Sequence, residues 1–286
     1  MRNHLIAIQG SAASFHDLAA KKYFGEEVSV MECGSFKEVC DKIAGNKVDY
    51  GIIAIENKVA GSILLNYQLI ESYKLHIIGE TYLPIELQLL GKEGSSLAGI
   101  KEIISHPMAL GQSQDFLSGL ENVTVTEFKD TATCAKLVLQ NNGNEVAVIA
   151  GPAVGKKYDL KILKHDVADV SQNFTRFYIL SKGDHYADNA NKASITLQVK
   201  NIAGKLSDVL SVIKARGLNM TKIQSVPSPG DANIYSFHLD IEFDARETFV
   251  SLMKELESHT TSLKVLGIYK GERHTGMLRE KLTNTN

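Results

Sequence analysis

The stretch VDYGIIAIENKVAGSILLNYQLIESYK, Val48–Lys74, shows the pattern that decides the fold class. Its first part, YGIIAI, is a short apolar run typical of a buried strand, and the part from Gly61 onward has helical spacing. The same strand-then-helix order repeats through the first 182 residues, starting with HLIAIQG followed by SFHDLAAKKYFG. Repeated pairs of this kind predict α/β layers with mainly parallel sheets.

A second pattern follows the polar segment GDHYADNANK at 183–192, which we interpret as a linker. Strands are expected at about 193–200, 220–227, 233–243 and 263–269, with helices at about 205–216 and 246–259. This β-α-β-β-α-β order predicts a ferredoxin-like unit of about 80 residues. The polar tail at 272–286 is expected to be frayed.

Composition excludes several classes of function. The chain of 286 residues is 44% hydrophobic and has a net charge of −2, which argues against nucleic-acid or membrane-surface binding. It contains no 18-residue apolar run and begins directly with a strand pattern, so we expect a protein of the cytoplasm. Its three cysteines form no C-x-x-C pair and its nine histidines lack ligand spacing, so no metal is expected. No glycine-rich nucleotide fingerprint is present, so no cofactor is expected.

Polar residues follow several expected strands, at the edge where a parallel sheet binds ligands. They are Ser11 and Ser14 in QGSAASFH, Glu56 and Asn57 in AIENKVAGS, His106 in ISHPMALGQS, and Thr131 in DTATCA. Each stretch precedes a helix, whose free N–H groups are able to receive an anion. Simple capping of the helix is the alternative for these stretches.

The stretch SQNFTRFYIL, Ser171–Leu180, places Thr175 and Arg176 side by side in an apolar strand. A guanidinium in such a strand is costly unless an anion or a carboxylate meets it. In a regular strand the two side chains point to opposite faces, so one faces the site and the other its support. Two interpretations of Arg176 stay open: it binds a substrate carboxylate, or it pairs with a structural one such as Glu56 or Asp169.

These stretches, taken in order, resemble the prephenate dehydratase family over about 6–270. The family motif I-E-N-S-x-x-G-S is IENKVAGS here, S-H-P-Q-A-L is SHPMAL, and D-x-x-x-N-x-T-R-F is DVSQNFTRF. The regulatory part of the family, an ACT domain, matches NMTKIQSVP and KVLGIY. Any one of these motifs is weak, but five of them in this order and spacing are specific.

The resemblance implies a carbon–oxygen lyase that converts prephenate to phenylpyruvate with loss of carbon dioxide and water, without cofactor or metal. It implies a catalytic domain at 1–182 with two lobes like those of periplasmic binding proteins, chain crossings near 79–90 and 167–175, and an ACT domain at 193–271. Thr175 is the implied catalytic donor to the leaving hydroxyl. The implied substrate-binding residues are Asn57, Ser62, Ser105, Thr131, Asn173 and Arg176.

The resemblance also implies feedback inhibition by L-phenylalanine and a homodimer or homotetramer, since ACT units pair through their sheets. The implied effector residues are Gly204, Leu206, Asn219, Ser225 and Pro227. The family's G-A-L loop is GKL here and its E-S-R-P is QSVP, so the transmission of phenylalanine binding stays open. In the catalytic part Lys58 replaces the serine of I-E-N-S, and this long cation either binds a carboxylate or reaches solvent.

Three other functions stay open. The first is the same fold acting on arogenate, which carries an amine in place of the keto group, and rates on the two substrates would separate these cases. A non-enzymatic amino-acid sensor and a binding protein for another dicarboxylate are the remaining two. The intact T-R-F motif argues against a sensor, because a sensor needs no donor at a leaving hydroxyl.

Overall fold

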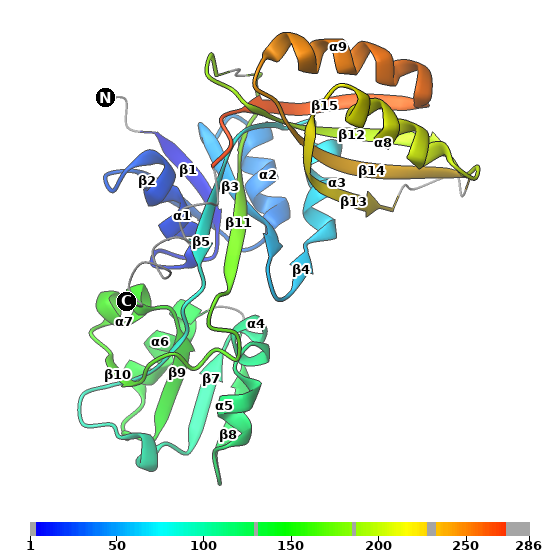
Figure 1. The fold of residues 1–286 in the computed structure, drawn as a ribbon. Helices are drawn as coiled ribbons and strands as arrows, with labels where there is room; N and C mark the ends of the chain where they lie inside the picture. The colour runs from blue at the N-terminus through cyan, green and yellow to red at the C-terminus, as the bar shows by residue number, and fades with distance from the viewer. Residues whose placement is uncertain (1–3, 129–130, 185–186, 228–232, 273–286) are drawn as a thin grey trace, which may run out of the picture.

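The computed structural model describes residues 4–128, 131–184, 187–227 and 233–272 and arranges them around three β-sheets (Figure 1). Two of the sheets form separate lobes, and the third packs beside the first lobe, where β15 (Ser262–Tyr269) contacts β5 (His76–Pro84). Helices and strands alternate through both lobes, so the predicted α/β class is confirmed.

The first lobe has the strand order β2-β1-β3-β11-β5. Its remaining strands and its helices are β1 (Leu5–Gln9), α1 (Phe15–Phe24), β2 (Ser29–Cys33), α2 (Phe36–Ala44), β3 (Tyr50–Asn57), α3 (Leu64–Ser72) and β11 (Phe174–Ser181). β1 is parallel to β2 and β3, but β11 is antiparallel to both β3 and β5. The prediction of mainly parallel sheets is therefore wrong here, because β11 returns from the second lobe and runs against both of its neighbours.

One predicted helix start is also wrong. Gly61 and Ser62 form the short strand β4 (Gly61–Ser62), which pairs with the end of β3, and α3 begins only after Ile63. A glycine suits this tight return because the backbone at Gly61 has φ +79°, a conformation that side chains disfavour. Ser62 is thereby held opposite Glu56 instead of capping a helix.

The second lobe has the strand order β10-β6-β9-β7-β8. Its elements are β6 (Gln88–Gly91), the short helix η1 (Leu97–Gly99), β7 (Glu102–Ser105), α4 (Pro107–Gly111), α5 (Gln114–Ser118), β8 (Thr124–Glu127), α6 (Thr131–Gln140), β9 (Val146–Ala150), α7 (Pro152–Tyr158) and β10 (Lys161–Lys164). The chain passes between the lobes twice, from β5 to β6 and from β10 back to β11. The second crossing thus leads into β11, which pairs with β5, the strand from which the first crossing leaves.

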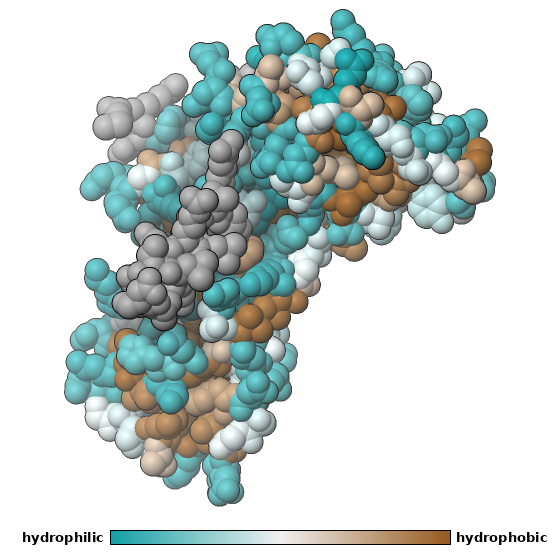
Figure 2. Space-filling view, in the orientation of Figure 1, coloured by the Kyte–Doolittle hydropathy of each residue, from teal (hydrophilic) through white to brown (hydrophobic). Residues whose placement is uncertain are grey.

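The third sheet has the order β13-β14-β12-β15, built by the predicted β-α-β-β-α-β sequence. Its remaining elements are β12 (Lys192–Lys200), α8 (Lys205–Ala215), β13 (Asn219–Val226), β14 (Ile234–Glu242), α9 (Arg246–Leu256) and η2 (Glu257–His259). Both helices pack on one face through an apolar cluster that includes Val209, Leu239 and Phe249. The opposite face meets the first lobe, and apolar residues reach the surface on the β13–β14 side (Figure 2), where Ile223 and Tyr235 are exposed. Most of the predicted tail, from residue 273 onward, lies outside the described residues.

Candidate active site

The register of two neighbouring strands brings Thr175 and Asn57 together. β3 and β11 run antiparallel, and Thr175 on β11 lies opposite Asn57 at the end of β3. The Asn57 amide nitrogen Nδ2 donates a hydrogen bond to Thr175 Oγ1 at 2.9 Å. Both residues are buried. The structure therefore places a hydroxyl and an amide in contact where β3 ends.

The orientation of the Asn57 amide follows from its other contacts. Its oxygen Oδ1 accepts hydrogen bonds from the backbone N–H groups of Val59 and Ala60, at 3.0 and 2.9 Å. An N–H group cannot accept these bonds, so the NH₂ group is the end that faces Thr175. The oxygen of Thr175 therefore acts as an acceptor toward Asn57, and its own proton stays available to another group.

The second lobe reaches this pair through Gln112, the residue that ends α4. Its Nε2 donates to Asn57 Oδ1 at 3.3 Å, and its Oε1 accepts from Asn173 Nδ2 at 3.2 Å. Asn173 Oδ1 and the hydroxyl of Ser113 are buried, and among the described residues they meet no hydrogen-bond partner. Most buried polar atoms in folded proteins have a hydrogen-bond partner, so these two atoms are candidates for contact with another molecule.

Gln112 was not singled out by sequence reasoning. It lies in the quoted stretch ISHPMALGQS, seven residues after the end of β7 at Ser105. Only polar residues that follow a strand directly were considered from the sequence, and Gln112 is not one of them. Its signal was the run of polar residues, Gln112 and Ser113, that directly follows the short helix α4.

Three predicted substrate-binding residues lie in other settings. Ser105 is fully buried and donates to the carbonyl oxygen of Ile149, so its hydroxyl joins β7 to β9. Ser62 Oγ accepts from Lys222 Nζ at 2.9 Å and thus contacts the third sheet. Thr131 begins α6 and is partly buried. The proton of Ser105 is thus donated within the second lobe, whereas Ser62 meets Lys222 as an acceptor.

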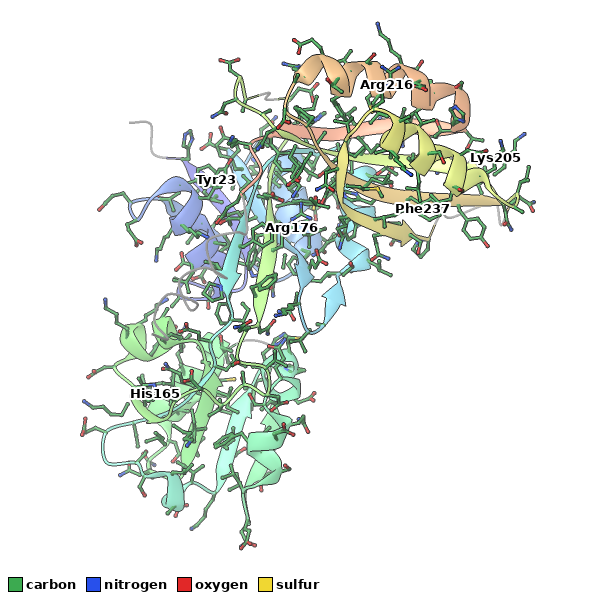
Figure 3. The ribbon with its side chains drawn as sticks, in the orientation of Figure 1. Tyr23, His165, Arg176, Lys205, Arg216 and Phe237 are labelled. Atoms are coloured by element: carbon green, nitrogen blue, oxygen red, sulfur yellow. The ribbon has the colours of Figure 1, made fainter. Side chains whose placement is uncertain are left out.

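Arg176 points away from Thr175, into the junction between the first lobe and the third sheet (Figure 3). Its Nε and Nη2 both donate to Glu80 Oε2, and its Nη1 donates to Asp240 Oδ2. The side chain is only 3% exposed. The interpretation of a structural carboxylate partner describes this geometry, but the partners are Glu80 and Asp240, not Glu56 or Asp169. The prediction that Arg176 binds substrate is wrong, because buried carboxylates occupy its guanidinium.

The junction is a buried, charge-balanced cluster. Lys192 Nζ donates to Glu80 at 2.9 Å, so two cations face two carboxylates. Burial alone would raise the pKa of Asp240, but the charge of Arg176, the contact with His238 and the charge of Lys192 together outweigh it and hold that pKa well below its usual value. The hydroxyl of Tyr178 also donates to Asp240, at 3.0 Å, and burial raises the pKa of this phenol. Each buried charge thus has a partner, as such charges require.

The first turn of α1 lies on the Thr175 face of β11. His16 makes an edge-on contact with Phe177, two residues after Thr175, and its Nε2 accepts from the backbone N–H of Ala54 at 3.3 Å. Burial lowers the pKa of His16 to about 4, so the ring is neutral at pH 7. Ser14 caps α1, its Oγ accepting from the backbone N–H of Asp17, so for Ser14 the alternative of simple helix capping describes the structure. Ser11 Oγ is buried and meets no hydrogen-bond partner among the described residues.

Lys58 and His106 take up structural contacts. Lys58 Nζ lies 5.6 Å from the centre of the Phe174 ring, and Phe174 is on the same face of β11 as Arg176. His106 caps α4, its Nδ1 accepting from the N–H of Met108 at 3.1 Å. In the part of the chain that is described, no three His, Cys, Asp or Glu side chains come together as metal ligands. The same residues include no helix long and apolar enough to cross a membrane.

The five predicted effector residues fall at two ends of the third sheet. Gly204 and Leu206 start α8 beside the loop at Asn201, which bonds to Asn233. Ser225 and Pro227 lie at this same end, since Val226 pairs with Ser236. Asn219 lies at the other end of β13, where its Nδ2 donates to Glu242 at 3.0 Å. At about 3.3 Å per residue the two groups are roughly 20 Å apart.

The fold and the site define a class: a mixed α/β protein with two lobes, a polar cluster formed by both of them, and an added four-stranded unit. A family model described as "Prephenate dehydratase" matches residues 6–185, and the chain belongs to this family. It is 32% identical over 266 residues to the bifunctional chorismate mutase/prephenate dehydratase of Aquifex aeolicus, covering 92% of this chain and 73% of the relative.

Two solved structures share the fold over nearly the whole chain. One is GqqA, described as a novel type of quorum quenching acylases, with a TM-score of 0.84, 26% identity, and coverage of 95% of this chain and 99% of that one. The other is prephenate dehydratase from Arthrobacter aurescens in complex with L-Phe, with a TM-score of 0.83, 23% identity, and coverage of 93% and 89%. Both include the four-stranded unit within the matched length.

Proposed function

We propose that the chain is a prephenate dehydratase, which converts prephenate to phenylpyruvate, carbon dioxide and water. Family membership supports the reaction. The observation that supports the assignment of roles is the hydrogen bond from Asn57 Nδ2 to Thr175 Oγ1, which leaves the Thr175 proton free to be donated.

In this reaction two bonds of the ring break. The bond to the ring carboxylate breaks with its electron pair left in the ring, and the bond to the ring hydroxyl breaks as that electron pair completes the aromatic system. The departing hydroxyl gains negative charge and needs a donor. A threonine hydroxyl is a very weak acid, so Thr175 acts chiefly as a positioned hydrogen-bond donor to the departing hydroxide, and the proton that completes the product water comes from solvent.

Asn57, Gln112 and Asn173 form the support of that donor. Asn57 holds Thr175, and Gln112 ties Asn57 to the second lobe and to the crossing that precedes β11. Contact between groups of both lobes depends on how the lobes close, so closure would complete the site around substrate. The unpartnered Asn173 Oδ1 and Ser113 hydroxyl are the polar atoms we assign to substrate contact.

The test compares Thr175→Ala and Thr175→Ser by the rate at which phenylpyruvate forms from prephenate at neutral pH. Removal of the hydroxyl should lower kcat by about 10²–10³-fold, as loss of one such donor does in other enzymes. The serine variant keeps the hydroxyl and should retain most of the turnover. A Thr175→Ala variant that is folded and fully active would move the donor role to another residue. Rates on arogenate, measured beside those on prephenate, define the substrate.

A second candidate is an acylase, since GqqA resembles this chain over nearly its full length. A nucleophilic threonine requires a neighbouring base that accepts its proton. Asn57 instead donates to Thr175 through its NH₂ group, and the oxygen of that amide is engaged by the backbone. This geometry favours the donor role and therefore the dehydratase.

We also propose that residues 1–182 form the catalytic domain and that residues 193–271 form an ACT regulatory domain that binds L-phenylalanine. The Arthrobacter aurescens protein of the same fold is in complex with L-Phe. Because the candidate effector residues fall at two ends of β13, one site that uses both groups needs a second copy of the chain, which supports a homodimer or homotetramer. L-phenylalanine should lower turnover and raise the melting temperature.

A further inference from the structure

Four charged residues join the catalytic strands to the third sheet directly beside Thr175. On β3 and β11 the register pairs Thr175 with Asn57, and the next pair along the strands is Arg176 with Glu56. On the facing sheet the register pairs Lys222 of β13 with Asp240 of β14. The two pairs meet with opposite charges: Arg176 contacts Asp240 at 2.5 Å, and Lys222 contacts Glu56 at 2.9 Å. We call these four residues the charge square.

The charges alternate around the charge square. Each cation has a carboxylate opposite it on its own sheet and another across the junction, so the arrangement holds only when the two strand pairs are aligned. Three of the side chains are buried, with exposures of 3% for Arg176, 0% for Asp240 and 7% for Lys222. Interactions between buried charges are screened much less than those at the surface.

Lys222 has a second contact that reaches the active-site loop. Its Nζ donates to Ser62 Oγ at 2.9 Å, and Ser62 pairs with Glu56 across the β3–β4 hairpin. The connecting residues of this hairpin include Val59 and Ala60, whose N–H groups fix the Asn57 amide. Lys222 therefore binds both arms of the hairpin that orients Thr175.

We propose that Lys222 is a positioning residue for the reaction: through Glu56 and Ser62 it holds the hairpin in which Asn57 orients Thr175. The third sheet is then part of the support of the active site, in addition to any effector site it carries. The kinetic test of this proposal rests on the proposed function, because it measures turnover of prephenate. The structural test depends only on the contacts of Lys222. A misplacement of about 1 Å at a reacting centre is enough to lower a rate up to about 10²-fold.

The kinetic test compares Lys222→Met with Lys264→Met. Lys264 on β15 also forms an ion pair between the third sheet and the first lobe, with Glu71 at 3.5 Å. Its side chain is 61% exposed, and its partner lies on α3 and not on the hairpin. We expect Lys222→Met to lower kcat by about tenfold with little change in KM, Lys222→Arg to restore most of it, and Lys264→Met to match the unchanged protein. Turnover is expressed per folded molecule, since loss of folded protein alone would leave kcat unchanged. Wild-type kcat in folded Lys222→Met overturns the proposal.

The structural test does not depend on turnover. A double-mutant cycle of Lys222→Met and Glu56→Gln, with the melting temperature as its readout, measures whether the two side chains are coupled. We expect the double variant to melt at a higher temperature than the sum of the single shifts predicts. Additive shifts overturn the contact itself. Should the unchanged protein form no phenylpyruvate, the proposed function fails, and this cycle still decides whether Lys222 and Glu56 are in contact.

Discussion

Replacing Asn57 with aspartate tests the donor geometry with almost no change in shape. One carboxylate oxygen still accepts from the N–H groups of Val59 and Ala60, so the hairpin keeps its two backbone bonds. The other oxygen takes the place of Nδ2, 2.9 Å from Thr175 Oγ1. A carboxylate donates nothing, so Thr175 must donate to it, and its proton is no longer available to the leaving hydroxyl. The change thus reverses the direction of one hydrogen bond.

The expected loss follows from the role of that proton. Loss of one donor aimed at developing negative charge raises the barrier by about 2.7–4 kcal/mol, so kcat should fall by about 10²–10³-fold. The new negative charge also repels a dicarboxylate substrate, so KM should rise. Steady-state formation of phenylpyruvate from prephenate gives both numbers. The melting temperature should fall, because the new carboxylate is a buried charge and replaces a donor that also faces the carbonyl oxygen of Phe174 at 3.4 Å. Both kinetic constants are therefore measured on folded protein.

Asn141→Asp is the matched control. Asn141 is an exposed residue whose Oδ1 accepts from the N–H of Gly143 at 2.8 Å, a role that aspartate keeps. The control should therefore retain wild-type kcat and KM. The reasoning is refuted if folded Asn57→Asp turns over within about threefold of the unchanged protein while Thr175→Ala does not, because the direction of the Asn57–Thr175 bond would then be irrelevant.

Two further predictions concern stability. The pKa of His16 is about 6.5 in the unfolded chain and about 4 in the folded protein. Between these values the unfolded state binds more protons than the folded state. The free energy of unfolding therefore falls as the pH is lowered from 7 to 4, by at most about 3 kcal/mol. Denaturant titrations should show a shallower fall for His16→Gln, with the same change at exposed His165 as the control, and an equally steep fall in His16→Gln would contradict this assignment. A Cβ on Gly267 would overlap the backbone carbonyl of Ile77, where β15 crosses β5. Gly267→Ala should therefore lower the free energy of unfolding by roughly 2–4 kcal/mol, whereas Gly119→Ala, which meets only ordinary contacts, should change it by less than about 1 kcal/mol. Equal midpoints for the two glycine variants would show that this crossing is not tightly packed.

The sequence predicted the starts of α1 and α2 and the buried strands, because these depend on residues that are close together in the chain. Serine caps begin α1 and α2, and the apolar runs became the buried strands β1, β3 and β11. The alternation of side chains along a strand also predicted that Thr175 and Arg176 face opposite ways. The pairing of Thr175 with Asn57 is different, because it joins residues 118 apart in sequence. Only the family resemblance placed those two residues in one site.

Long-range contacts account for what the sequence did not show. Glu80 and Asp240, the partners of Arg176, are 96 and 64 residues away, and nothing in their own surroundings marks them as partners. The direction of β11 likewise depends on where the second lobe returns the chain, which local propensity does not encode. Gln112 was missed for a related reason, since its contact with Asn57 exists only when the two lobes lie together.

The junction between the first lobe and the third sheet limits the movement that the linker at 183–192 would otherwise allow. A polar connection of this kind leaves two units free to move. Instead, one buried cluster joins residues from both sides of it and includes Lys192, the last residue of the expected linker, which begins β12. Arg176 and Glu80 come from the first lobe, while Asp240 and Lys192 come from the third sheet. Removing one member of a buried pair leaves an uncompensated charge and costs about 3–5 kcal/mol. Movement of the third sheet away from the lobe is therefore strongly opposed. Because Thr175 is the neighbour of Arg176 on β11, the same contacts that hold the third sheet against the lobe also hold the strand that carries the proposed donor.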